Sequence, residues 1–178
     1  MLALARSVIE NSSFATAVQP VLDRLSRSSG VTAIGVEIAG LEHMVVLALS
    51  QSHVPFRLHV DVGSRFPALI SATGRLVAAF TTRPWAEVEA RFRSLRWQNA
   101  PALAAWKREV ERVRKRGYSI DRGNYINGVT VLSVPVFNPR QELTHALVVL
   151  GVAEQLDTAR CDAITADMRV EAGRLSSL

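Results

Sequence analysis

Residues able to hold the polar group of a ligand gather in one short segment, residues 67–74, which reads PALISATG. Ser71 and Thr73 carry hydroxyl groups, and Ala72 and Gly74 let a ligand approach the backbone closely. An apolar run follows, which predicts a helix beginning at Gly74. The first turn of a helix has unpaired N–H groups and a partial positive charge, so this segment suits a carboxylate. The structural alternative is that Ser71 or Thr73 caps the helix and Gly74 allows close packing.

Side chains suited to catalysis or metal binding form no recognisable set. The motifs GxSxG, P-loop and HExxH are absent. The histidines, at positions 43, 53, 59 and 145, lack the spacing of metal ligands, so we predict no metal and no other cofactor. A hydrolase using Ser71 or Ser133 with His59 is the enzymatic alternative. Because no nucleophile, base and oxyanion site come together in the sequence, we expect no catalytic residues.

Composition favours one domain with a substantial core, since 48% of the 178 residues are hydrophobic. No apolar run approaches the roughly 18 residues that a membrane span needs. The N-terminus lacks a secretory layout and Cys161 is the lone cysteine, which fits a reducing cytoplasm. The net charge of +5 is concentrated in residues 91–116. That basic stretch is either a solvated helix face or a phosphate-binding stripe, and no nucleic-acid-binding motif accompanies it.

Two β-branched, apolar runs, Val129–Phe137 and Leu143–Leu150, predict a β-hairpin. The link between them, NPRQE, is a short turn sequence. Neither run alternates cleanly between apolar and polar residues, so both faces of each strand should contact apolar material. An antiparallel pair covered on both sides can enclose a small-molecule chamber.

The remaining elements follow from periodicity and from turn and cap residues. Strict alternation over residues 56–62 places His59 and Asp61 together on a wet strand face. The other predictions are helices over 2–27 with a break at 10–14, strands at 31–38 and 44–49, a loop at 63–73, helices starting at 84 and 101, and a last helix at 155–176. Tight hairpins dominate this order, which predicts an α+β fold with a central antiparallel β-sheet flanked by helices.

Two blocks of the chain resemble the effector-binding domain of IclR-family bacterial transcriptional regulators. In residues 62–80, VGSRFPALISATGRLVAAF, the positions that match the pattern G-x-R-x-P-L-H-A-T-A-x-G-K-A-L-L-A are Gly63, Arg65, Pro67, Ala72, Gly74 and Ala79. Arg75 and Leu69 replace the usual lysine and histidine of that pattern. The positions that match G-Y-x-x-D-x-x-E-x-x-x-G-V-x-C-I-A-A-P-V are Gly117, Tyr118, Asp121, Gly128, Val129, Pro135 and Val136.

The resemblance implies a GAF-like sensor domain over residues 29–178, with a linker and first helices in residues 1–28 packed on it. It implies a cytoplasmic protein that binds a small-molecule effector, forms a homodimer or tetramer, and has no membrane partner. Such regulators contact DNA through a winged helix-turn-helix domain, and no part of this chain resembles one. We therefore expect DNA binding only through a domain outside the chain, which is either an excised fragment or a natural stand-alone domain.

Self-association would use apolar positions on the first and last helices, unless these pack on the domain's own sheet. Those positions are Phe14, Val18, Leu22, Ile164 and Met168.

The predicted effector site departs from the family pattern in one respect. Where relatives that sense small polar acids carry cysteine and serines, this chain has Val131, Val148 and Leu150. Each such side chain gains about 1.5–3 kcal/mol when fully buried, whereas an unpaired polar group of a ligand costs about 1–3 kcal/mol. We therefore predict an effector with an apolar or aromatic body, which can carry one carboxylate or hydroxyl near the segment 71–74.

The predicted effector-binding residues are Ser71, Ala72, Thr73, Gly74, Val131, Ser133, Val148 and Leu150. Two alternatives stay open. The aliphatic residues could fill the core and leave no pocket, or the chain could be a GAF-like ligand-binding module with no role in DNA binding.

Overall fold

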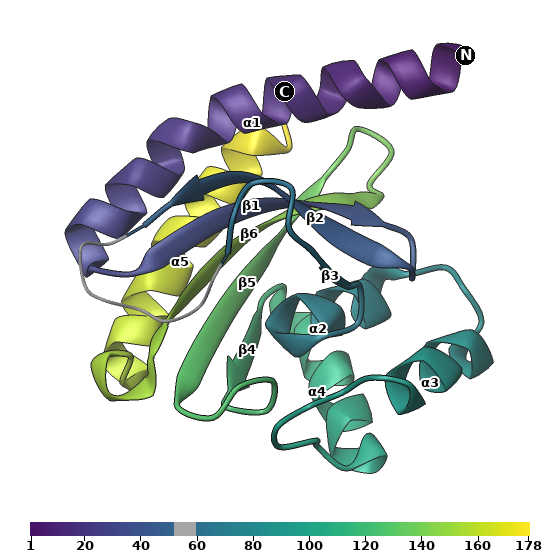
Figure 1. Ribbon diagram of the computed structural model, residues 1–178, viewed down its shortest axis with the longest axis vertical. Helices are drawn as coiled ribbons and strands as arrows, with labels where there is room; N and C mark the ends of the chain where they lie inside the picture. Colours follow the sequence, from purple (N-terminus) through teal and green to yellow (C-terminus); the bar gives the residue numbers. More distant parts are fainter. Residues whose placement is uncertain (52–59) are drawn as a thin grey trace.

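A computed structural model describes residues 1–51 and 60–178, which form three layers (Figure 1). The middle layer is an antiparallel sheet, six-stranded in the described residues, with the order β3-β2-β1-β6-β5-β4. The strands are β1 (Thr32–Ala39), β2 (His43–Ser50), β3 (Arg65–Pro67), β4 (Ser119–Arg122), β5 (Val129–Phe137) and β6 (Leu143–Val152). The α+β fold with a central antiparallel sheet is thus confirmed.

Helices cover both faces of this sheet (Figure 1). They are α1 (Leu2–Ser29), α2 (Ser71–Phe80), α3 (Trp85–Arg93), α4 (Leu103–Arg116) and α5 (Thr158–Leu175), with a short 3₁₀ turn at Ala153–Gln155. The long helix α1 and helix α5 lie on one face, and α2, α3 and α4 lie toward the other (Figure 1). The sheet is therefore a partition between two apolar cores.

Strand β6 shows the two-sided burial that its sequence predicts. Val148 and Leu150 belong to the core under α2, whereas Leu147 and Val149 belong to the core under α1 and α5. All of them are at most 6% exposed. The predicted hairpin is confirmed: β5 has the predicted bounds, and β6 extends two residues further, to Val152.

The break predicted in the first helix at residues 10–14 is wrong, because α1 is continuous and even contains Pro20. Asn11 does not cap a helix, since its side chain contacts Nε2 of His145 on β6 at 2.9 Å. Phe14 and Val18 pack over Gly35 of β1, where a Cβ atom would lie only 3.0–3.1 Å from their side chains. Packing of this face on the sheet outweighs the local preference of cap residues, as is usual for helices in proteins.

Other differences from the prediction concern two helix starts and three short strands. Helix α2 starts at Ser71 rather than Gly74, and α5 starts after the 3₁₀ turn rather than at residue 155. Strands β3 and β4 are absent from the prediction because each is a short edge strand, and β3 interrupts the loop predicted at 63–73. The strand predicted at 56–62, including His59, lies mostly outside the described residues. Its described part, 60–62, is not a strand.

The residues proposed for self-association pack instead within the domain. Phe14, Val18, Leu22, Ile164 and Met168 are all at most 7% exposed and belong to the core under α1 and α5. The large exposed apolar side chains of α1 lie in its first nine residues, where the helix projects past the sheet (Figure 1). They are Leu2, Leu4, Val8 and Ile9.

No helix of residues 1–51 and 60–178 is long and apolar enough to cross a membrane. The same residues hold no cluster of three or more His, Cys, Asp or Glu side chains arranged for a metal ion. Cys161 is a buried thiol in α5, and its burial raises its pKa.

Gly74 provides a test of the close packing at the start of α2. A Cβ atom at this position would overlap the backbone of Leu69, so we expect Gly74→Ala to lower the free energy of unfolding by about 1–3 kcal/mol. Gly173, inside α5, has open space around it, so Gly173→Ala should raise stability by up to about 1 kcal/mol. Urea unfolding of both variants measures the difference. Equal effects at the two positions would contradict the close approach.

His145 provides a test of how α1 is held on the sheet. Its ring is stacked on Phe14, and burial lowers its pKa from the usual value of about 6.5, with Glu10 and Glu37 opposing the shift. Because the unfolded chain binds this proton more readily, the stability that neutral His145 contributes is present above pH 6.5. It is lost as the pH falls from 6.5 through the folded-state pKa.

We expect His145→Gln to lose less stability than the wild type between pH 7.5 and pH 5.5, measured by urea unfolding at each pH. Identical pH dependence of the two proteins would contradict a lowered pKa of His145 in the folded state.

Candidate functional site

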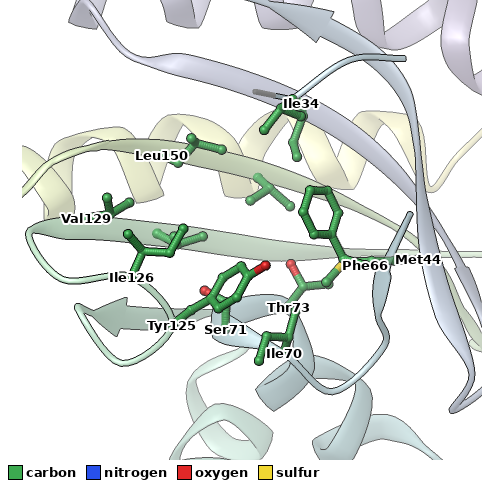
Figure 2. Close-up of a pocket in the computed structure, with 13 residues that line it drawn as sticks. Ile34, Met44, Phe66, Ile70, Ser71, Thr73, Tyr125, Ile126, Val129 and Leu150 are labelled. Carbon is green, nitrogen blue, oxygen red and sulfur yellow. The ribbon is translucent and has the colours of Figure 1, made fainter. Parts of the chain in front are cut away.

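A cavity lies between the sheet and the N-terminal end of α2, with the loop after β4 as its third wall (Figure 2). The lining comes from segments far apart in the sequence. It consists of Ile34, Met44, Val60, Phe66, Ile70, Ser71, Thr73, Tyr125, Ile126, Val129, Val131, Val148 and Leu150.

None of these lining residues carries a formal charge, and the polar side chains among them are three hydroxyl groups, those of Ser71, Thr73 and Tyr125. The volume of the cavity is about 60 Å³, counted as the space open to the centre of a water-sized sphere. A single water needs only about 10–15 Å³ on the same measure, so the cavity has room for a small molecule. A mostly apolar, concave lining with a few polar groups is typical of small-molecule sites.

The structure brings five of the predicted site residues to this cavity and leaves three outside it. Its lining includes Ser71, Thr73, Val131, Val148 and Leu150, but not Ala72, Gly74 or Ser133. The aliphatic residues therefore do not close up the core, as one alternative had it. Gly74 serves the packing of α2 on Leu69 instead, as its structural alternative predicts.

The other eight of the 13 lining residues were not predicted from the sequence. Strand β1 contributes Ile34 because it pairs directly with Val148 of β6, and that register was not predictable. Phe66 comes from β3, which is a short edge strand. Tyr125 and Ile126 come from the loop between β4 and β5. The available signal in the sequence was this pair of large side chains among Gly and Asn residues.

Ser71 is held in place by Asp121, although the two are 50 residues apart. The Ser71 hydroxyl donates to Oδ2 of Asp121 at 2.7 Å, and both residues are at most 5% exposed. Ser71 has a φ of 58°, a left-handed conformation that is uncommon for residues with a Cβ atom. The hydroxyl is therefore not a helix cap, and Ile70 occupies the cap position without a side-chain hydrogen bond.

Asp121 also fixes the loop that forms the third wall of the cavity. Its carboxylate accepts hydrogen bonds from the backbone N–H groups of Asn124 at 2.8 Å and Tyr125 at 3.2 Å. Asp121 comes from β4, so one buried carboxylate joins β4, its following loop and the start of α2. Its match to the family pattern was visible in the sequence, but its partners were not.

Arg75 completes this network from inside α2 and is only 1% exposed. Its guanidinium donates to the carbonyl of Ser71 at 2.9 Å, to Oδ1 of Asn124 at 2.7 Å, and to the carboxylate of Glu109 on α4. All three guanidinium nitrogens thus have partners. A buried charge tolerates its desolvation only when it is paired in this way.

The second hydroxyl pair connects α2 to β5. Thr73 Oγ1 and Ser133 Oγ lie 3.0 Å apart, and both residues are at most 2% exposed. Ser133 therefore supports the site from behind rather than lining it. Because each hydroxyl has one proton and only one proton is used between them, the pair keeps a spare donor.

Tyr125 and Phe66 add two aromatic rings to the otherwise aliphatic lining, and the Tyr125 hydroxyl points into the cavity beside Thr73 (Figure 2). Partial burial raises the pKa of Tyr125, so its hydroxyl stays protonated at neutral pH. Rings of this kind present large flat apolar surfaces, and the tyrosine adds a polar group.

These contacts give the hydrolase alternative no support. Ser71 is hydrogen-bonded to a carboxylate and Ser133 to another hydroxyl, and neither has a histidine partner among the described residues. His59 lies outside those residues.

Other surface features are less suited to a small molecule. Two larger hollows have exposed, charged side chains in their walls, one beside Arg6 and Glu10 and the other beside Arg83 and Glu142. The basic stretch 91–116 forms parts of α3 and α4, where several cations pair with carboxylates, such as Arg93 with Glu89 at 2.7 Å. That pairing favours the solvated-face interpretation for this part of the stretch.

Comparison with known proteins identifies the kind of domain. Residues 6–177 match the family described as bacterial transcriptional regulator IclR C-terminal. The Streptomyces griseus glycerol operon regulatory protein is 29% identical over 160 residues, which is 88% of this chain and 61% of that protein. The chain spans 54–69% of the length of the four curated relatives compared.

Solved structures share the fold at lower sequence identity. The IclR protein of Thermotoga maritima superimposes with a TM-score of 0.82 at 19% identity, over 99% of this chain and 72% of that one. The inducer-binding domain of PobR from Acinetobacter, a double mutant in complex with 3-hydroxybenzoic acid, gives a TM-score of 0.74 at 18% identity. That match covers 91% of this chain and 97% of the PobR domain.

A double-mutant cycle tests the hydroxyl pair behind the cavity. Thr73→Val and Ser133→Ala each leave a buried hydroxyl without its partner, so each should lower stability by about 1–3 kcal/mol. The double variant should lose about 1 kcal/mol less than the sum of the two.

Thr165 serves as the control, because its hydroxyl is buried in α5 and has no hydrogen-bond partner among residues 1–51 and 60–178. Thr165→Val should therefore be near neutral and additive with Thr73→Val in urea unfolding. Additivity of Thr73→Val with Ser133→Ala would show that the two hydroxyls do not interact.

Proposed function

Because the chain belongs to the IclR family of bacterial transcriptional regulators, as the C-terminal domain, we propose that its inner cavity binds a small-molecule effector. The observation that supports this proposal is the cavity itself, whose described lining residues carry no charge and come in part from β1, β5, β6 and the start of α2. The fold and the relatives are those of regulators rather than enzymes.

The effector that suits this lining has an apolar or aromatic body. Val131, Val148 and Leu150 all contribute to the wall. They stand at positions where, by the family resemblance, sensors of small polar acids carry cysteine and serines. A small hydrophilic acid would leave polar groups unpaired against these aliphatic side chains. A complex of the PobR domain with 3-hydroxybenzoic acid supports the idea that this fold accepts an aromatic ring.

Effector binding would control DNA occupancy through the arrangement of subunits. IclR-family regulators bind DNA through an N-terminal domain, which lies outside this chain. We propose that residues 1–28, as part of α1, form the link to that domain, and that residues 29–178 form the sensor of a cytoplasmic homodimer or tetramer. An effector that binds one arrangement of the subunits better than another would shift the population toward it.

The alternative of a ligand-binding module unrelated to transcription is not favoured. Nearly the whole chain matches a family of transcriptional regulators, and the curated relatives named by function are regulators as well.

A cavity-filling variant tests the site. We expect Val148→Phe to occupy the chamber and to abolish binding of aromatic probes, at a stability cost of about 1–3 kcal/mol. Val170→Phe, the same change on the exposed side of α5, is the control and should bind like the wild type. Titration calorimetry against phenols, aromatic acids and glyoxylate measures the affinities. Tight binding of glyoxylate alone would contradict the proposed apolar effector.

A further inference from the structure

We propose that the cavity selects an uncharged effector whose polar group is a hydrogen-bond donor, such as an alcohol or phenol, and rejects carboxylates. This inference rests on the proposed function and narrows its ligand class. The first turn of a helix ordinarily attracts an anion, so the sequence alone allowed a carboxylate at residues 71–74. Three features of the structure argue for the opposite preference.

The first feature is the direction of the Ser71 hydrogen bond. Ser71 lines the cavity, but its single hydroxyl proton is already donated to Asp121 at 2.7 Å. Toward a ligand the oxygen can therefore offer only lone pairs. A carboxylate has no proton to donate to that oxygen, whereas an alcohol or phenol has one.

The second feature is the negative charge behind Ser71. Asp121 is 1% exposed and lies beside the first residue of α2, where the helix dipole favours an anion. The protein thus supplies its own anion at this helix end. A ligand carboxylate hydrogen-bonded to Ser71 would stand next to that carboxylate in a poorly solvated place, where repulsion between like charges is strong.

The third feature is that the lining residues described by the structure, which exclude 52–59, contain no cation to compensate a ligand carboxylate. Arg75 is buried four residues after Ser71, but its guanidinium already donates to Glu109, Asn124 and the carbonyl of Ser71. At the same end of the cavity as Ser71, the Tyr125 hydroxyl and the Thr73–Ser133 pair can both donate and accept (Figure 2). An uncharged hydroxyl can therefore be satisfied at each of these groups.

Two probes of the same ring and similar size test the inference, namely benzyl alcohol and benzoate, each titrated calorimetrically into the protein at pH 7. We expect the wild type to bind benzyl alcohol at least about tenfold more tightly than benzoate. Asp121→Asn should reduce this ratio about tenfold, because it removes the negative charge behind Ser71. Asp162→Asn, the same change at an exposed position of α5, should leave the ratio unchanged.

Tyr125→Phe gives a measurement that does not depend on the folding of the Asp121 variant. It should weaken benzyl alcohol binding about tenfold and leave toluene binding unchanged, since only the alcohol can use the hydroxyl.

Benzoate binding as tight as benzyl alcohol binding in the wild type would overturn the inference and leave the proposed effector cavity intact. If benzyl alcohol, toluene and benzoate all fail to bind, the proposed effector cavity itself fails, and the inference fails with it.

Discussion

Burial of β6 on both faces is the constraint on which the rest of this domain depends. A strand with Leu147 and Val149 on one side and Val148 and Leu150 on the other must be covered twice. Helices α1 and α5 cover one side, and α2 with its neighbours covers the other (Figure 1). A sheet covered in this way is the middle of three layers, and a chamber can form wherever a covering helix leaves space above the strands. That space lies at the N-terminal end of α2.

Polar contacts, rather than apolar packing, determine the shape of this chamber. Asp121 accepts hydrogen bonds from Ser71 and from the backbone of the following loop, and Arg75 ties Ser71, the loop and α4 together. The start of α2 and the loop that carries Tyr125 are therefore held relative to each other by charged groups that lie behind the wall. Because such groups are costly to leave unpaired, they specify one arrangement, while the described residues that line the chamber are uncharged.

Elements whose signals are local in the sequence could be predicted, whereas features that depend on contacts between distant residues could not. The hairpin and helices α3 and α4 were predictable because their signals are local: β-branched runs, turn residues, Pro84 before a helix and Gly117 after one. The helix break at residues 10–14 was predicted wrongly because Asn11 finds a partner on β6, 134 residues away. Eight of the 13 lining residues of the cavity were missed for a related reason, since strand register and edge strands depend on contacts distant in sequence.

By itself, the sequence determined the fold class, the family and the apolar character of the ligand wall, because hydrophobic patterning and motif residues express themselves locally. Only the tertiary structure decided which hydroxyl protons remain available to a ligand. Ser71 looked like a helix cap or an anion ligand, and its pairing with Asp121 makes it a hydrogen-bond acceptor instead. Donor and acceptor capacity depends on which groups the fold brings within about 3 Å of each other, and no local pattern records that.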